Sequence, residues 1–192
     1  MGTDIHGVFQ RRDKSTGKWC DVPSDYQQKR HYQLFAVLAG VRNGYGVAGL
    51  PTGRIVTPIA EPRGTPIDFA MTRANKTELW LGNHSYSWLT GDEMLAWFEK
   101  APEVEKVGIL DRSVYEKWDG VSEPRSYCTG VFGTNVVQIN DNEVEKKLAP
   151  HWTHIQCFWH SALRVELAYF FDEVARLKKK HGDVRFVFGF DG

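Results

Sequence analysis

The stretch TDIHGVFQRR, residues 3–12, alternates between apolar and polar side chains, as a β-strand covered by a core on one face does. Ile5 and Phe9 point to one face, and Asp4 and His6 share the other. Residues 13–17 predict a turn, and residues 18–22 a returning hairpin strand. The sequence therefore opens with a strand that presents an acid and an imidazole together.

The rest of the chain predicts helices and further strands. Residues 32–40 are typical of a helix closed by Gly40, and Thr90 with Glu93 forms a capping box for another. The remaining expected elements are a strand at 153–165, a helix at 166–180 and a strand at 184–191, with shorter elements at 113–118, 136–139 and 141–148. We expect an α+β fold with a mixed or mostly antiparallel sheet, helices packed on one face, and a crossover unit from 153 to 191.

Residues 40–66 differ in composition from everything around them. This segment holds six Gly and four Pro, three Arg, no Lys and one acid, Glu61. A long irregular segment inside a compact domain is usually functional. We read it as a binding loop or lid within a single domain that covers residues 1–192.

Charge and composition exclude several classes of protein. Basic and acidic residues balance at 24 each, so bulk nucleic-acid binding is not expected. No apolar run approaches the length of a membrane span, and no apolar leader opens the chain. Three cysteines without metal-site spacing favour a reducing compartment, so we expect a cytoplasmic protein.

The first candidate site combines Asp4, His6 and His84. Two residues apart on a strand, Asp4 and His6 lie about 6.6 Å apart on one face, so they can share a metal ion or a proton. His84 would complete a two-His, one-carboxylate set for one divalent metal ion, or the three could serve as catalytic acid and base. The alternatives are a solvated polar strand and a hydroxyl-rich loop that enters a helix.

A second group of residues suits an anionic ligand. Guanidinium groups bind phosphate oxygens in a fork, and small polar groups complete such sites. The alternative is that these arginines pair with nearby acids and that Asp191 is a solvated end. The ligand-binding candidates are Arg42, Asn43, Arg63, Asp68, Ser85, Ser87 and Asp191.

Five segments carry a resemblance to a known family. They are MGTDIHGVF, LFAVLAGVRN, PIAEPRGTPID, HSYSWLT and VRFVFGFDG, and they span nearly the whole chain. The chain resembles a family of phage and bacterial proteins of uncharacterised activity, which opens M-G-x-D-I-H and ends in a strand like VRxVFxFD. The resemblance implies a phage or mobile-element setting and action on a host pathway. Tyr86 departs from the family pattern, which often has a second His there.

Three functions follow from these residues and this setting. The first is a metal-assisted hydrolase of a nucleotide-like, phosphate-containing host defence signal, with Asp4, His6 and His84 as catalytic groups. The second is a non-catalytic protein that sequesters such a ligand, in a homo-oligomer that covers the exposed sheet. The third is a protein–protein inhibitor that places its aromatic surface against a host enzyme.

Overall fold

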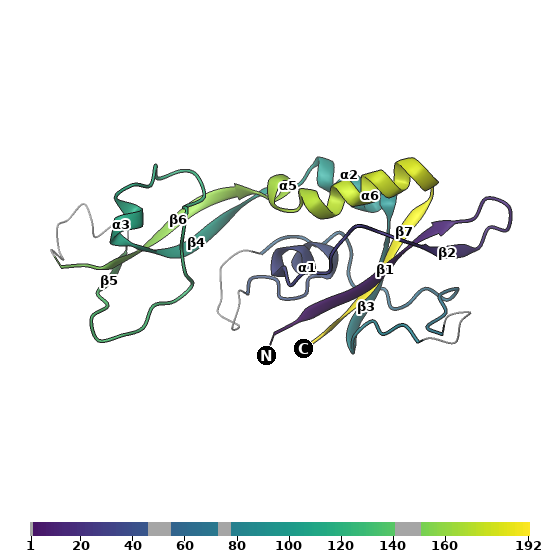
Figure 1. The fold of residues 1–192 in the computed structure, drawn as a ribbon, viewed down its shortest axis with the longest axis horizontal. Helices are drawn as coiled ribbons and strands as arrows, with labels where there is room; N and C mark the ends of the chain where they lie inside the picture. The colour runs from purple at the N-terminus through teal and green to yellow at the C-terminus, as the bar shows by residue number, and fades with distance from the viewer. Residues whose placement is uncertain (1, 46–54, 73–77, 141–150) are drawn as a thin grey trace.

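The computed structural model describes residues 2–45, 55–72, 78–140 and 151–192, and it confirms an α+β fold. Two separate sheets and a layer of helices make up this part of the chain (Figure 1). The elements are β1 (Asp4–Arg12), β2 (Trp19–Val22), α1 (Tyr32–Ala39), β3 (His84–Thr90), α2 (Gly91–Glu99), β4 (Glu103–Asp111), α3 (Arg112–Tyr115), β5 (Gln138–Asn140), β6 (His154–Ala162), α5 (Leu163–Glu166), α6 (Ala168–His181) and β7 (Val184–Asp191).

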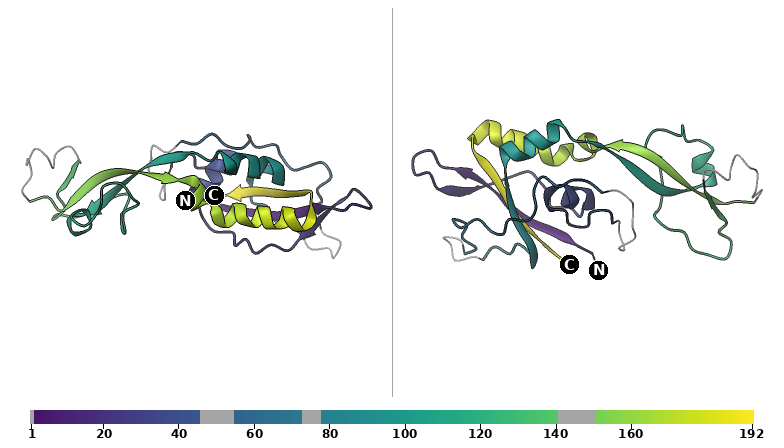
Figure 2. Two further views of the ribbon diagram at one scale, coloured as in Figure 1. Left: turned by 90° about the horizontal axis from the view of Figure 1, so that it is seen from above. Right: turned by 180° about the vertical axis from the view of Figure 1, so that it is seen from behind.

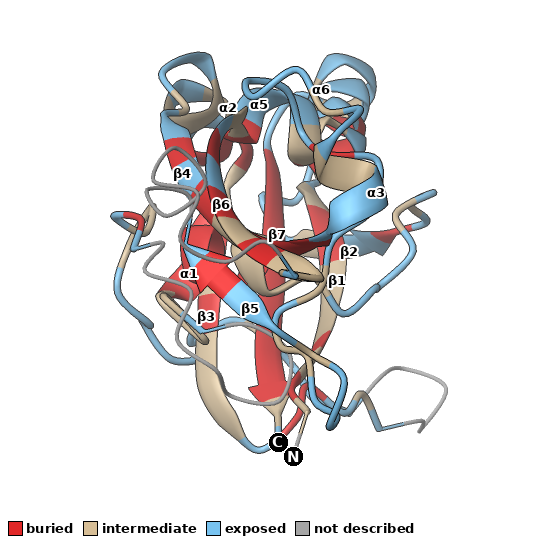
Figure 3. Cartoon of the chain, turned by 90° about the vertical axis from the view of Figure 1, so that its left-hand side faces the viewer, coloured by how far each residue is buried: buried red, intermediate tan, exposed pale blue. Residues whose placement is uncertain are grey.

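The larger sheet has the strand order β2-β1-β7-β3, with all neighbours antiparallel. The register pairs Ile5 with Phe190 and Asp4 with Asp191, so β1 and β7 show matching faces. Strand β7 lies between β1 and β3, and Figure 3 shows it buried along almost its whole length. We call this sheet, with α1, α2 and α6, the body.

One face of the body sheet is covered by helices, as the sequence predicts. Phe186, Phe188 and Phe190 of β7 point into this layer and are fully buried. Helices α2 and α6 lie side by side over them (Figure 2), and Phe98 stacks on Phe171 with ring centroids 4.4 Å apart. The apolar spacing of both helices explains this packing, because residues three and four apart share a helix face.

The second sheet, with the order β4-β6-β5, extends away from the body (Figures 1 and 2). Strands β4 and β6 are antiparallel, and β5 is parallel to β6. Leu110, Ile155 and Trp159 are buried in a small core beneath α3. We call residues 103–162 the arm. The single-domain interpretation of the sequence stays a prediction.

The arm joins the body through a buried ion pair. The Lys106 side chain of β4 is only 5 % exposed, and its ammonium group contacts the carboxylate of Glu166 in α5. Glu123 lies 3.4 Å from the same nitrogen, and Ser161 donates a hydrogen bond to Glu166. A charge buried this deeply needs such partners, because desolvation disfavours an unpaired ion.

Several predicted elements differ from the observed ones. The crossover unit is wrong, because β6 and β7 belong to different sheets. The strand predicted to continue to 165 ends at Ala162, where α5 begins. The element expected at 113–118 is the helix Arg112–Tyr115, which is capped by Asp111, since its carboxylate accepts a hydrogen bond from the Ser113 amide. The helix expected at 141–148 lies outside the described residues.

Two strands were not expected from the sequence. Residues 84–90, read as a hydroxyl-rich loop, form β3, and residues 103–111 form β4. Among the described residues, no helix has the length and apolar character that a bilayer crossing requires.

Candidate functional site

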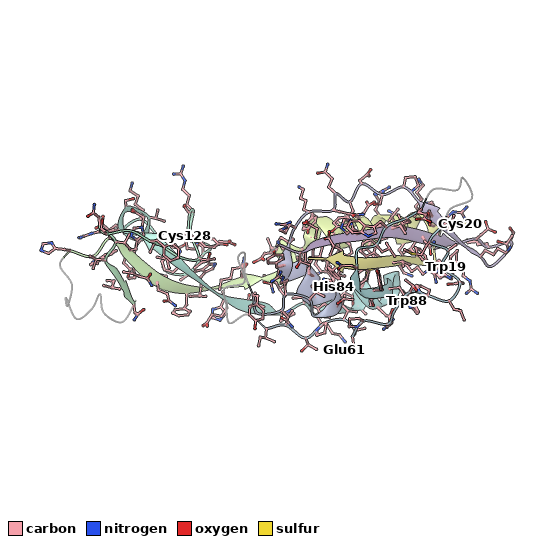
Figure 4. The ribbon with its side chains drawn as sticks, turned by 90° about the horizontal axis from the view of Figure 1, so that it is seen from below. Trp19, Cys20, Glu61, His84, Trp88 and Cys128 are labelled. Carbon is pink, nitrogen blue, oxygen red and sulfur yellow. The ribbon has the colours of Figure 1, made fainter. Side chains whose placement is uncertain are left out.

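A pocket of about 600 Å³ opens where the C-terminal end of α1 meets the start of β3. Gly40 ends α1 in the left-handed conformation, with a φ of 69°, so the chain turns there and enters the predicted binding loop. The polar residues that line the pocket are Thr3, Arg42, Asn43, Glu61, His84 and Ser85. Four of these six were predicted as site residues. Figure 4 places His84 and Glu61 in the body, away from Cys128 in the arm.

Arg42 forms one wall of this pocket. Its Nε donates a hydrogen bond of 2.8 Å to the Thr3 hydroxyl, and its guanidinium lies 5.6 Å from the centre of the Tyr32 ring. Both contacts hold the side chain at the pocket wall. Arg42 is therefore a positioned cation at the edge of the cavity.

Asn43 secures the loop beside the pocket. Its amide nitrogen donates to the Val56 carbonyl at 2.7 Å, and its amide oxygen accepts from the Val56 amide at 2.9 Å. This two-way bond imitates a strand pairing and ties residue 43 to the far side of the loop. Asn43 thus has a structural role and also lines the pocket, and its ligand-binding role stays a prediction.

An irregularity in β3 contributes further lining residues to the pocket. The register of β3 against β7 shifts between His84 and Ser87, which marks a bulge. Ser85 has a φ of 50°, and its hydroxyl lies 2.9 Å from Nδ1 of His84. The His84 ring stacks on Phe190, with centroids 6.0 Å apart. The bulge thus aims an imidazole and a hydroxyl at the cavity.

Backbone strain is concentrated at this pocket. Among the residues that the structure describes, Arg42 and Ser85 are the two non-glycine residues with a positive φ, at 55° and 50°. Both line the same cavity. Such residues cost about 1–3 kcal/mol each and tend to persist at ligand sites, where the surrounding structure enforces them. The coincidence marks the pocket as the best candidate site.

Asp4 and His6 lie on the other face of the sheet. Arg30 donates two hydrogen bonds to Asp4, of 2.8 and 2.6 Å, and these lower the pKa of that carboxyl. Nε2 of His6 lies 3.3 Å from Asp191, and Trp80 packs on the imidazole with centroids 4.4 Å apart. Asp191 also accepts from the Asp4 amide. The predicted sharing of a face by Asp4 and His6 is correct.

The predicted three-residue metal site is not assembled. His84 pairs in register with Phe190, whose ring points into the core, while Asp4 pairs with Asp191 on the outer face. The sheet itself therefore separates His84 from Asp4 and His6. No group of three His, Cys, Asp or Glu side chains within the described ranges is arranged to hold a metal ion.

Three other candidates are engaged in structural contacts outside the pocket. Arg63 makes a bidentate ion pair with Glu93, at 2.6 and 3.2 Å, so the alternative of pairing with a nearby acid holds. The buried Ser87 hydroxyl accepts from the Arg63 amide. Asp68 pairs with the buried Arg185 at 2.8 Å. These contacts fasten residues 63–68 onto the sheet.

Glu61 and Thr3 were not predicted as site residues. Glu61 carried a signal, because it is the one acid in a segment with three arginines. Thr3 carried none, since its role depends on Arg42, which lies 39 positions further along the chain. Comparisons with protein-family models, curated proteins and solved structures match nothing to this chain.

Proposed function

We propose that this chain binds a small phosphate-containing, nucleotide-like ligand in the pocket between α1 and β3. The carrying observation is that both strained non-glycine residues of the described chain, Arg42 and Ser85, line this one cavity. A fold keeps two such conformations together when their side chains are needed in those places.

One end of the cavity suits the phosphate. Arg42 offers a guanidinium, Ser85 a hydroxyl, and His84 an imidazole fixed through its Nδ1 contact with that hydroxyl. A phosphate oxygen accepts hydrogen bonds from the guanidinium and from one of the other two groups, because the contact between the hydroxyl and a neutral imidazole uses the proton of one of them, and a cation strengthens each bond. The volume of about 600 Å³ lies within the range of small-molecule pockets.

Glu61 supplies the opposite polarity. Its exposed carboxylate lines the same pocket and accepts hydrogen bonds only. A ligand that carries hydroxyl or amino groups in addition to its phosphate satisfies both ends, whereas a bare anion meets repulsion at Glu61. Nucleosides and sugars with a phosphate group have this chemistry.

Binding without turnover is better supported than metal-assisted hydrolysis. The donors that such a hydrolase requires are divided between two faces of the sheet among the described residues. The pocket keeps one imidazole, His84, which is a general acid or base only if the ligand presents a bond beside it. Sequestration of a host signal by a phage protein follows as part of this proposal, and it depends on the resemblance alone.

The test is calorimetric titration with AMP, ADP, ATP, ribose 5-phosphate and adenosine, with and without EDTA, followed by recovery of the ligand. We expect a phosphorylated compound to bind and adenosine to fail. Arg42→Gln should weaken binding by about tenfold or more, because a charge-assisted hydrogen bond is lost. Arg30→Gln is the matched control on the outer face and should bind like the parent chain.

Each result decides a part of the proposal. Ligand recovered intact supports sequestration, and recovered product supports a hydrolase at the same pocket. Failure of every phosphorylated compound to bind, or equal binding by Arg42→Gln and the parent chain, would overturn the assignment.

A further inference from the structure

A second pocket lies in the arm, between α3 and the loop that follows it. Its volume is about 530 Å³, and its lining residues are Ser113, Val114, Lys117, Trp118, Arg125 and Ser126. Two cations and two hydroxyl groups therefore meet around an indole ring and a valine. This site shares no residue with the pocket of the body.

The loop that carries Arg125 is held at its beginning by a turn. The Asp119 carboxylate accepts hydrogen bonds from the amides of Val121 and Ser122, both at 2.9 Å. The Trp118 indole donates a 2.7 Å hydrogen bond to the Ser122 carbonyl. The indole ring is thus fixed in orientation by the same turn that directs the loop.

The end of this loop is held as firmly. Glu123 lies 3.4 Å from the buried Lys106 ammonium and accepts a hydrogen bond from the Tyr127 hydroxyl. Cys128 exchanges two backbone hydrogen bonds with Ile109 of β4, at 2.8 and 3.0 Å. Arg125 and Ser126 therefore lie between anchored points, and a pre-formed site loses little entropy when it binds.

The two cations have no acidic partner within the described ranges. Arg112, five positions before Lys117, pairs with Glu116, and Arg30 and Arg176 each pair with a carboxylate. No side-chain hydrogen bond or ion pair of either Lys117 or Arg125 is found in the part of the chain that the structure describes. Two like charges beside one cavity repel each other, and an anion between them removes that repulsion.

We propose that this arm pocket binds a small phosphate monoester carried on an aromatic ring. The phosphate dianion matches the charges of Lys117 and Arg125 and accepts hydrogen bonds from Ser113 and Ser126. The flat apolar part of the ligand packs against Trp118 and Val114, where the indole offers a large surface at low entropic cost. This inference does not depend on the function proposed for the body.

The test follows the indole N–H signal of Trp118 by NMR in the full chain, with the signal assigned through Trp118→Phe. Phenyl phosphate is the probe, and inorganic phosphate and phenol supply its two halves separately. We expect phenyl phosphate to move the signal at a concentration about tenfold or more below that needed with either half alone, because charge and ring contacts act together.

Paired variants separate a site from general charge attraction. Lys117→Glu with Arg125→Glu should abolish the response to phenyl phosphate. The control variant Lys29→Glu with Lys179→Glu changes the net charge of the chain by the same amount, at positions outside the arm. It should keep the response to phenyl phosphate. Agreement between the NMR spectrum of each variant and that of the parent chain, for signals outside the arm, reports whether the variant is folded.

Three outcomes would overturn the proposal. They are an unmoved Trp118 signal, equal responses to phenyl phosphate and to phenol, and a response that persists in the folded Lys117→Glu, Arg125→Glu variant. Because Arg42 and His84 are unchanged in all these variants, a failure here leaves the body pocket untouched.

Discussion

The body and the arm reach a defined shape by different means. Among the described residues, one cluster of 23 buried apolar residues centres on the body and takes in Val104 of β4, and a second cluster of five lies in the arm. The arm instead places its loop with hydrogen bonds at Asp119, Trp118 and Cys128. The free energy gained by burial grows with the apolar area that is buried, whereas each hydrogen bond adds little net stability. The body should therefore set the stability of the chain, and the arm should open first.

The largest expected effect comes from Phe188→Ala in the centre of β7. Phe188 is fully buried and packs on Phe186 and Phe190, with centroids 5.2 and 5.8 Å apart. The substitution removes a ring from a packed core and should lower the free energy of unfolding by about 4 kcal/mol. Urea unfolding followed by far-UV circular dichroism measures it.

Phe188→Leu is the control for that prediction. It keeps much of the volume and should cost less than half as much. If Phe188→Ala changes the unfolding midpoint no more than Phe188→Leu does, the body core is not what stabilises the chain.

A smaller effect is expected from Leu110→Ala in the arm. Leu110 is fully buried among Ile155, Cys157 and Trp159. Its loss should cost about 2 kcal/mol within the arm, at the low end for such substitutions because the small cluster can collapse around the gap. Hydrogen exchange should speed up at β4 and β6 while the amides of β1 and β7 keep their protection.

Leu110→Met should leave exchange in both regions near that of the parent chain. Equal acceleration in β1, β7 and the arm after Leu110→Ala would mean that the two cores unfold as one unit, and it would end the comparison.

The smallest effect is expected from the carboxylate of Glu93 in α2, which binds Arg63 of the loop before β3. Hydrogen bonds from Arg63 lower the pKa of Glu93 from 4.5 to about 2, and those from Thr90 add to this shift. An acid whose pKa is lower in the folded state stabilises the fold at pH values above its unfolded-state pKa. This stability is lost as the pH falls through the folded-state pKa of about 2. The urea concentration at the unfolding midpoint should therefore decrease as the pH is lowered from 5 to 2.5.

Glu93→Gln should flatten this pH dependence while its amide oxygen keeps the hydrogen bonds from Thr90. Glu99→Gln, on the same helix, removes an exposed acid and should leave the slope as it is. A slope that survives Glu93→Gln would assign the pH dependence to other acids.

Much of the body could be predicted from the sequence because its elements carry local signals. The alternation in residues 3–12, the Thr90 and Glu93 capping box, and the helix before Gly40 each specify their structure within a few residues. Strand β4 was missed because Lys106 breaks its apolar pattern, and its partner Glu166 lies 60 positions away. Long-range pairing leaves no local trace.

The candidate site was likewise predictable in part: some of its residues could be predicted from the sequence and others could not. Arg42, His84 and Ser85 were identified from residue type, and the structure gathers them in one pocket. The predicted grouping of His84 with Asp4 and His6 was wrong because the sequence did not predict a strand at residues 84–90. Only the register of these residues against β7 decides which face of the sheet His84 occupies. The arm pocket had no signal, since serine, lysine and arginine are ordinary surface residues.

Strand β7 lies between β1 and β3 in the sheet, yet it follows both of them along the chain. Until the ribosome has made residues 184–191, β1 and β3 have no neighbour to complete the sheet between them. The apolar helix layer that later packs on Phe186, Phe188 and Phe190 stays uncovered during that time, so the nascent protein has an interval in which chaperones can engage it.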